Sequence, residues 1–201
     1  MCGFVGVLND KELNHSVLMS MTNTLSHRGP DDRGTWSSLE DGLGLGHVRL
    51  SIIDLSIHGH QPMISKNNNH IIVFNGEIYN HLQIRSEIED LVKVEWNGHS
   101  DTETLLESLS IFGIDKTLKK INGMFSFALW NKDTKELILA RDHTGQKPLY
   151  YGWDGNIFFF ASELKAIKSH PKFSRLINHS AANDILEYNY IPENKSIYKN
   201  I

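Results

Sequence analysis

The sequence has only one cysteine, Cys2, among its 201 residues. A single thiol cannot form an internal disulfide, so a disulfide framework is excluded and a reducing compartment is expected. The first twenty residues lack the basic and then apolar pattern of a secretory signal, and no apolar run approaches the length of a membrane span. We therefore predict a cytoplasmic protein with no membrane partner.

Long blocks of like charge are also absent. The chain carries 20 Lys and Arg against 24 Asp and Glu, a formal net charge of −4. This balance argues against nucleic acid as a partner. A hydrophobic content of 40%, without repeats or low-complexity runs, predicts one domain with its own core.

The single cysteine stands at the start of an apolar segment, Gly3 to Leu8, which predicts a short buried strand. Removal of Met1, favoured by the small side chain that follows it, would make Cys2 the terminal residue. Its thiol nucleophile and an α-amine with an ordinary pKa of roughly 7.7–8.0 would then lie on one residue. A lone cysteine is more often a small buried hydrophobe, but this position favours a nucleophile.

Apolar periodicity and turn residues divide the rest of the chain into strands and helices. The predicted strands cover residues 35–38, 43–50, 71–74, 124–130, 136–140, 149–152 and 157–161, and the predicted helices cover 11–24, 81–91, 101–112, 163–169 and 181–188. The strand 71–74 is expected to stop at Asn75-Gly76, and Ser100 with Glu103 is expected to form a capping box for helix 101–112. Because the strands come as hairpins around two grouped helices, we predict two antiparallel sheets packed on each other with helices outside.

Three polar clusters could serve a nucleophile at the terminus. The fork of Arg49 suits a carboxylate, Asp101 could meet an ammonium, and Asn75-Gly76-Glu77 offers an amide donor and an unhindered backbone N–H for an oxyanion hole. Each cluster has an ordinary alternative: an ion pair for Arg49, a favourable helix N-terminus for Asp101, and a turn for Asn-Gly. Together with Cys2, they supply every group needed to hold and cleave an α-amino acid.

Seven motifs, in order and nearly without gaps from residue 2 to about 170, carry a family resemblance. They are Cys2-Gly3, His27-Arg28-Gly29-Pro30-Asp31, Arg49-Leu50-Ser51-Ile52-Ile53-Asp54, Gly59-His60-Gln61-Pro62, Asn75-Gly76-Glu77-Ile78-Tyr79-Asn80, Ser100-Asp101-Thr102-Glu103 and Gly123-Met124-Phe125-Ser126-Phe127-Ala128. This series resembles the glutaminase domain of class II glutamine amidotransferases. The Arg-Gly-Pro-Asp and Arg-Leu-Ser-Ile motifs are more similar to the glutamine-hydrolysing asparagine synthetases than to the other branches.

The resemblance implies an α+β fold of the N-terminal nucleophile type, a four-layer αββα sandwich of two antiparallel sheets. It implies that Cys2 is the nucleophile and that Asn75 and Gly76 form the oxyanion hole. It further implies a glutamine site, in which Arg49 binds the α-carboxylate, and Glu77 and Asp101 hold the α-amino group. Leu50, Ser51 and Ile52 of the Arg-Leu-Ser-Ile motif, with the following Ile53, complete that site, the two isoleucines through backbone groups.

The resemblance also bears on domains, cofactors and partners. It implies a glutaminase domain over residues 2–180 and, over 181–201, the start of a link to a C-terminal synthetase domain. ATP and magnesium are expected only in that second half, because no Ser-Gly-Gly-x-Asp-Ser pyrophosphate loop occurs in this sequence. His27, His58 and His60 lack a recognisable ligand spacing, so no metal is predicted. A homodimer, another ammonia acceptor such as a sugar, and an inactive structural or regulatory module stay open.

Overall fold

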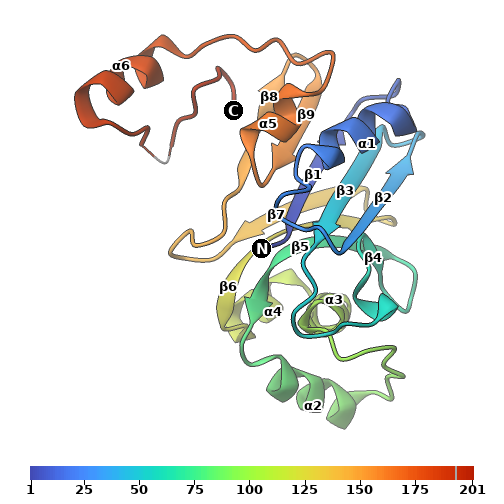
Figure 1. Cartoon of the computed structure of the whole chain (residues 1–201). Coiled ribbons are helices and arrows are strands. Elements are labelled where there is room, and N and C mark those ends of the chain that lie inside the picture. Colours follow the sequence, from blue (N-terminus) through green and yellow to red (C-terminus); the bar gives the residue numbers. More distant parts are fainter. Residues whose placement is uncertain (193) are drawn as a thin grey trace.

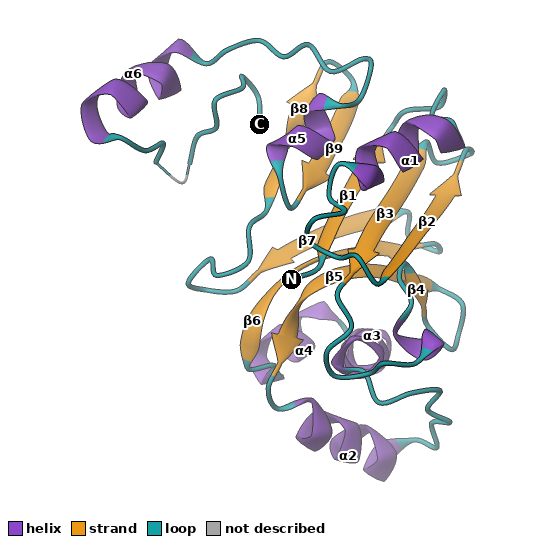
Figure 2. Ribbon diagram, viewed as in Figure 1, coloured by secondary structure: helices purple, strands orange, loops and turns teal. Residues whose placement is uncertain are grey.

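Two antiparallel sheets lie face to face, and each carries helices on its outer side (Figures 1 and 2). The computed structural model describes residues 1–192 and 194–201. The first sheet has the strand order β2-β3-β1-β9-β8, and the second has the order β4-β5-β6-β7. The strands are β1 (Gly3–Leu8), β2 (Asp32–Ser38), β3 (Leu43–Arg49), β4 (Met63–Ile64), β5 (His70–Ile78), β6 (Gly123–Asn131), β7 (Glu136–Arg141), β8 (Tyr150–Asp154) and β9 (Ile157–Ala161).

The helices divide between the two outer faces. Helices α1 (His15–Asn23) and α5 (Leu164–Lys168) cover the first sheet, and α3 (Asp101–Phe112) packs on β4 and β5 of the second sheet. Helices α2 (His81–Leu91) and α4 (Ile114–Lys120) pack on α3. A single 3₁₀ turn (Ile57–Gly59) lies between β3 and β4, and α6 (His179–Tyr188) belongs to the C-terminal segment. Among the described residues, no helix has the length and apolar character that a membrane crossing needs.

Three separate apolar clusters hold the four layers together. Alternate side chains of β1 point to opposite faces, so Phe4 packs between the sheets while Val5 packs under the helices. The cluster between the sheets includes Trp130 and Phe160, which are almost wholly buried. The predicted αββα sandwich is therefore confirmed.

The N-terminal strand lies in the middle of its sheet. Strand β1 pairs with β3 on one side and with β9 on the other, with Val5 opposite both Gly46 and Ala161. A Cβ atom at Gly6 would lie 2.1 Å from the Phe160 ring, so only glycine lets that ring cross the strand. This central pairing fixes the position of Cys2, which immediately precedes β1.

Strand β5 runs further than the sequence predicts. It continues through Asn75 and Gly76 to Ile78, because these residues stay in register with Ser126 and Phe125 of β6. The prediction that the strand stops at Asn-Gly, and its reading as a turn, are therefore wrong. Pairing with a long neighbouring strand overrides the local turn preference of the dipeptide.

The start of α1 and the capping of α3 also differ from expectation. Helix α1 begins at His15 rather than at Lys11, because the Asp10 carboxylate holds a turn at Glu12 and the Asn14 side chain caps the helix by accepting from the Val17 N–H. Ser100 caps α3 as predicted, but the Glu103 carboxylate turns away from it. It accepts instead from the N–H groups of Asn97 and Gly98, at 2.8 and 3.0 Å, so only half of the predicted capping box forms.

The C-terminal segment extends from the sandwich and then returns to it (Figure 1). Ile177, just before α6, bridges Tyr198, which follows that helix, and the Tyr198 ring packs edge-on against Phe173. The expected domain limit at residue 180 falls inside α6. Glu193, within the expected linking segment 181–201, lies outside the described residues.

Candidate active site

The predicted site residues meet in one cavity of about 140 Å³ at the start of β1. Cys2 lines this cavity, beside the end of β3 and residues Asn75 and Gly76 of β5. The cavity is lined by Met1, Cys2, Arg49, Leu50, Ile52, Ile53, Asp54, Gly59, Gln61, Phe74, Asn75, Gly76, Glu77, Ser100, Asp101, Thr102, Met124 and Lys147. Every predicted catalytic or binding residue is in this set except Ser51, which lies beside the cavity with its backbone N–H donating to Asp31.

The Cys2 thiol is partly buried against the loop that follows β3. The backbone N–H of Leu50 lies 3.4 Å from the sulfur, and the Leu50 carbonyl lies 3.7 Å away. Burial raises the pKa of the thiol, while the Leu50 N–H and the charge of Arg49 act in the opposite direction. The free thiol is therefore kept protonated at rest, and its activation needs a base close by.

Asn75 lines the cavity, and its side-chain amide has no acceptor among the described residues. Its side chain is 1% exposed, and its Nδ2 has no hydrogen-bond partner among the described residues. A buried amide N–H without an acceptor costs about 1–3 kcal/mol, so its retention suggests that an oxygen binds there. The neighbouring Gly76 lies so close to β6 that a Cβ would meet the Met124 carbonyl at 2.4 Å.

Arg49 ends β3 and is held in place by main-chain oxygens. Its Nη1 donates to the Ser56 carbonyl at 2.8 Å, and its Nη2 donates to the Asp54 carbonyl. The guanidinium group has five N–H donors, and these two contacts leave others for a ligand. A Cβ at Gly59 would overlap the guanidinium, so that glycine keeps the arginine in place.

The loop between Arg49 and Gly59 is fixed from inside by Asp54. Its carboxylate accepts from the N–H groups of Ser56 and His99, at 2.8 and 2.9 Å. Hydrogen bonds from Ser56, with that from His99, outweigh partial burial and hold the pKa of Asp54 at about 2. Asp54 is thus ionised at any physiological pH and serves to shape the wall that carries Ile52 and Ile53.

Asp101 begins α3 and supplies a carboxyl group that forms no ion pair with any residue the structure describes. It is 5% exposed and accepts from the Ile78 N–H at 2.9 Å. Burial raises its pKa to about 6 against that hydrogen bond, and the negative charge of Glu77 acts in the same direction as burial. A cationic group bound between Asp101 and Glu77 would relieve this penalty.

Two buried polar residues that were not predicted as site residues support β5 at the site: Gln61 lines the cavity, and His47 lies behind β5. The Gln61 side chain accepts from the Phe74 N–H at 2.6 Å and contacts Thr102 at 3.4 Å, which ties β5 to α3 beside Asn75. His47 is fully buried between the sheets, and its Nε2–H donates to the Phe74 carbonyl at 3.0 Å. Gln61 stands in a quoted motif and could have been found there, whereas nothing in the local sequence marks His47.

Two of the three histidines considered for a metal site, His27 and His60, bond acidic side chains. His27 bonds Glu163 and His60 bonds Asp32, at 3.0 and 2.7 Å. Within residues 1–192 and 194–201, no group of three or more His, Cys, Asp or Glu side chains is arranged to hold a metal ion.

The arrangement has the parts needed for acyl transfer from a free amino acid. Arg49 suits an α-carboxylate, Asp101 and Glu77 suit an α-ammonium, and the thiol of Cys2 faces the same cavity. The Asn75 amide can donate to an oxygen that becomes negative when the thiol attacks a carbonyl. The amino acid that fits must carry an acyl group on its side chain.

Comparison with known sequences agrees with this chemistry. The whole chain, residues 1–201, matches the family described as "Glutamine amidotransferase domain". It is 37% identical to "Putative asparagine synthetase (glutamine-hydrolyzing) 2" of Methanocaldococcus jannaschii, and the match covers 100% of this chain and 42% of that protein. It is 36% identical to asparagine synthetase (glutamine-hydrolyzing) 1 of Bacillus subtilis, covering 96% of this chain and 30% of that protein.

The chain is also similar to a protein that is not named an asparagine synthetase. The protein named amidase chry2 of Gibberella zeae is 38% identical over 149 residues, which cover 74% of this chain and 22% of that protein. The chain therefore spans less than half the length of these relatives.

Solved structures show the same fold. The structure described as the allosteric regulatory enzyme of purine biosynthesis superposes with a TM-score of 0.70 at 23% identity, covering 84% of this chain and 43% of that one. The glutamine phosphoribosylpyrophosphate amidotransferase of Bacillus subtilis superposes with a TM-score of 0.65 at 22% identity, covering 84% of this chain and 43% of that one. At these identities the likeness concerns the fold alone.

Proposed function

The chain belongs to the glutamine amidotransferase domain family, and from that premise we propose that it hydrolyses glutamine to glutamate and ammonia through a thioester on Cys2. The observation that carries the proposal is the buried Nδ2 of Asn75, which has no partner among the described residues, in a residue that lines the same cavity as Cys2. An amide donor is left unpaired where a carbonyl oxygen would become negative.

Glutamine would bind by its α-amino acid end. Its carboxylate would meet Arg49, and its ammonium would meet Asp101 and Glu77, so the side-chain amide would lie toward Cys2. Leu50, Ile52 and Ile53 would enclose the substrate from the loop side. Binding would lower the pKa of Asp101 from its raised value, because the ammonium places a positive charge beside it.

The reaction would proceed in two steps on one residue. Once Met1 is removed, the α-amine of Cys2 takes the thiol proton, and the sulfur forms a bond to the amide carbon. Asn75 and Gly76 stabilise the oxyanion, the amine returns the proton to the leaving nitrogen, and ammonia departs as the C–N bond breaks. Water, deprotonated by the same amine, then breaks the C–S bond and releases glutamate.

Replacement of the nucleophile tests the proposal directly. Cys2→Ala removes the only thiol in the sequence, so glutamate release from glutamine should fall to background. Asn75→Ala keeps the thiol and should lower kcat by on the order of 10²–10³, the usual effect of losing an oxyanion donor. Glutamate is measured by an enzyme-coupled assay, on protein whose intact mass shows loss of Met1.

A reactive glutamine analogue provides the second readout. It should add one adduct to the parent chain, located at Cys2 by peptide mass spectrometry, and none to Cys2→Ala. Glutamate release by Cys2→Ala at the parental rate would contradict the proposal. A mature parent chain that neither labels nor hydrolyses glutamine would support the inactive structural or regulatory module.

The acceptor of the ammonia is a separate proposal. We infer that the chain works in cis with a C-terminal synthetase domain that amidates aspartate with ATP, because its relatives named asparagine synthetase extend well beyond the matched part. The similarity to amidase chry2 favours keeping another acceptor as a second candidate. Aspartate-dependent asparagine formation by the full-length protein, with glutamine and ATP, separates the two. No cofactor is assigned to this chain.

A further inference from the structure

Arg28, in the loop after α1, contacts the main chain of the nucleophile itself. Its Nε–H donates to the Cys2 carbonyl oxygen at 2.9 Å, and its Nη2 lies 4.0 Å from the Met1 sulfur. The Arg28 side chain is 10% exposed, so the contact lies largely out of water. A Cβ at Gly3 would lie 2.9 Å from Arg28 Cδ, which shows how closely the arginine covers the first residues of β1.

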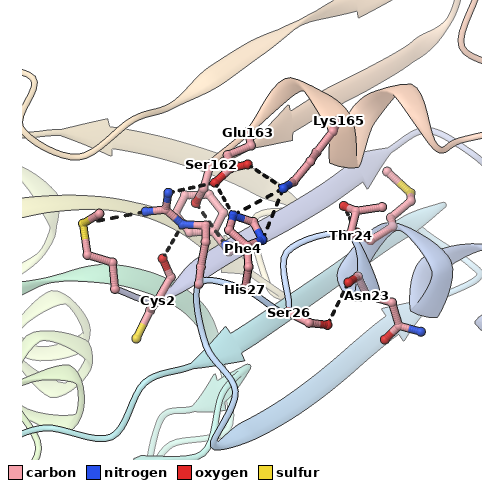
Figure 3. Close-up of polar contacts among 12 residues, drawn as sticks. Cys2, Phe4, Asn23, Thr24, Ser26, His27, Ser162, Glu163 and Lys165 are labelled. Atoms are coloured by element: carbon pink, nitrogen blue, oxygen red, sulfur yellow. Dashed lines mark hydrogen bonds and ion pairs between the residues drawn. The ribbon is translucent and has the colours of Figure 1, made fainter.

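Arg28 is anchored by a cluster of charges at the start of α5. Figure 3 shows His27, Glu163 and Lys165 of this cluster together. Its Nη1 donates to Glu163 Oε1 at 2.9 Å. The same carboxylate lies 3.0 Å from His27 Nε2 and 3.1 Å from Lys165 Nζ. Burial acts to raise the pKa of Glu163, but hydrogen bonds from Arg28, Lys165 and His27 outweigh it and hold that pKa at about 2.

Charged groups therefore surround Cys2 on two sides. The cavity side is more acidic than basic, and the main-chain side carries Arg28 as its nearest cation. The cavity side holds Arg49 from β3, Asp54 from the loop after β3, Glu77 from β5, Asp101 from α3 and Lys147 from the loop before β8, and the other side holds His27 and Arg28 from the loop after α1 with Glu163 and Lys165 at the start of α5.

We propose that Arg28 is a positioning residue for Cys2, which fixes the nucleophile through its carbonyl oxygen and places beside it a positive charge that favours loss of a proton from the thiol–amine pair. Glu163 holds the guanidinium in place and offsets part of its charge. The role of Arg28 in catalysis rests on the proposed function, but the effect of Arg28 on Cys2 can be measured without glutamine.

The direction of the effect does not depend on which group of Cys2 loses the proton. The thiol and the α-amine interact strongly, so their titration belongs to the pair. A positive charge close by favours the deprotonated form of either group, and a negative charge disfavours it. Removing Arg28 and removing Glu163 should therefore shift the titration of Cys2 in opposite directions.

Alkylation of the single cysteine measures this titration. The rate of reaction with iodoacetamide is followed against pH by intact mass, on chains shown to lack Met1. Arg28→Gln should move the midpoint up by about half a pH unit, and Glu163→Gln should move it down by a similar amount. Arg28→Lys keeps the charge, so the midpoint should stay near the parental value while kcat for glutamine falls several-fold.

Arg33→Gln is the matched control, because Arg33 is exposed and bonds Asn23 and Ser26 rather than Cys2. It changes the net charge as Arg28→Gln does and should leave the midpoint unchanged. A midpoint for Arg28→Gln that equals the control, or a shift of Glu163→Gln in the same direction as Arg28→Gln, overturns the proposal. If Arg28→Gln does not fold, as judged by thermal melting, Glu163→Gln and Arg28→Lys decide the question.

The two proposals fail in different ways. Absence of glutamine hydrolysis by the mature parent chain would overturn the proposed function, while the alkylation midpoints would still show whether Arg28 acts on Cys2. Normal glutamine hydrolysis by the parent, together with alkylation midpoints that do not change in the Arg28 and Glu163 variants, would overturn only the present inference.

Discussion

Burial of its carboxyl group, without an ion pair to any described residue, makes Asp101 a source of pH dependence at the binding site. Its pKa of about 6 means that it gains a proton as the pH falls from 7 to 5. The protonated form cannot attract an ammonium, so KM for glutamine should rise over this interval while kcat changes less. Steady-state kinetics of glutamate release between pH 5 and 8 measure both parameters.

Asp101→Asn should remove this pH dependence. We expect KM at pH 7.5 to rise by about 10- to 100-fold, the usual effect of losing one charge-assisted contact. Since burial raises the pKa of Asp101 above its ordinary value, ionisation of the folded chain costs stability as the pH rises through about 6. The variant should therefore unfold at a higher temperature than the parent at pH 8. A KM that still climbs on acidification in Asp101→Asn would assign the effect to another group.

At the scale of elements, the site depends on close approach between loops and the end of β3. Gly29, in the loop after α1, lies so near that strand that a Cβ would meet the Val48 carbonyl carbon at 2.4 Å. The next contact along the same loop is the Asp31 N–H, which donates to the Arg49 carbonyl at 3.0 Å. The loop that carries Arg28 thus packs directly on the strand that carries Arg49.

Gly29→Ala should force these two backbones apart. We expect loss of unfolding free energy on the order of 2 kcal/mol, and a fall in kcat/KM larger than the stability loss explains, because the loop also carries Arg28. Gly155→Ala is a suitable control: its φ is +60°, and no atom lies within 4 Å of the added Cβ. That variant should lose about 1 kcal/mol and keep full activity. Equal activity in the two variants would argue that the loop does not position the site.

The local sequence pattern was sufficient to predict most helices and strands. It failed where pairing with a distant segment determines the structure. The hairpin strands and helices α2 and α3 appear within a few residues of their predicted bounds, since hydrophobic spacing and the Ser100 cap are local signals. The predicted strand ends before Asn75, whereas β5 continues to Ile78, because this continuation depends on pairing with β6. Helix α4 was not predicted at all: it begins directly after Gly113, which has a φ of +79° and ended the apolar pattern of α3.

At the scale of the molecule, His47 joins the two sheets by a hydrogen bond from β3 to the Phe74 carbonyl on β5. Complete burial lowers the pKa of this imidazole to about 4, against the hydrogen bond to Phe74. A histidine whose pKa is lowered in the folded state contributes stability above its ordinary value of roughly 6.5, and this contribution is lost as the pH falls toward 4.

His47→Gln should make the sandwich less sensitive to acid. Glutamine can keep a donor toward Phe74 but does not titrate. The free energy of unfolding, measured by urea denaturation, should fall less between pH 7 and pH 5 in the variant than in the parent, with a limiting difference on the order of 3 kcal/mol at lower pH. Comparing the two proteins at each pH cancels the opposite contribution of Asp101. Parallel stability curves for the parent and the variant would show that His47 does not set the acid response.

The layered architecture followed from hairpin order, but the site did not follow from spacing alone. Cys2, Arg49, Asn75 and Asp101 lie far apart in the sequence and meet only because β1, β3, β5 and α3 converge at one cavity. Their selection rested on residue chemistry and on family resemblance. The side chains of Gln61, His47 and Arg28 contact main-chain groups near the site. Gln61 and Arg28 stand in motifs of the family resemblance, but no local pattern marks His47 or shows which main-chain groups the three side chains contact.

The central place of β1 in its sheet sets an order of events during synthesis. Strand β1 cannot complete its pairing until β9 exists, and the Phe4 N–H finds its acceptor on Ser162, 158 residues later. Ribosomes add about 5–20 residues per second, so the leading end stays without these partners for on the order of ten to thirty seconds. An aminopeptidase that removes Met1 would have this interval to act on an unpaired chain end, before β1 takes its place in the sheet beside Cys2.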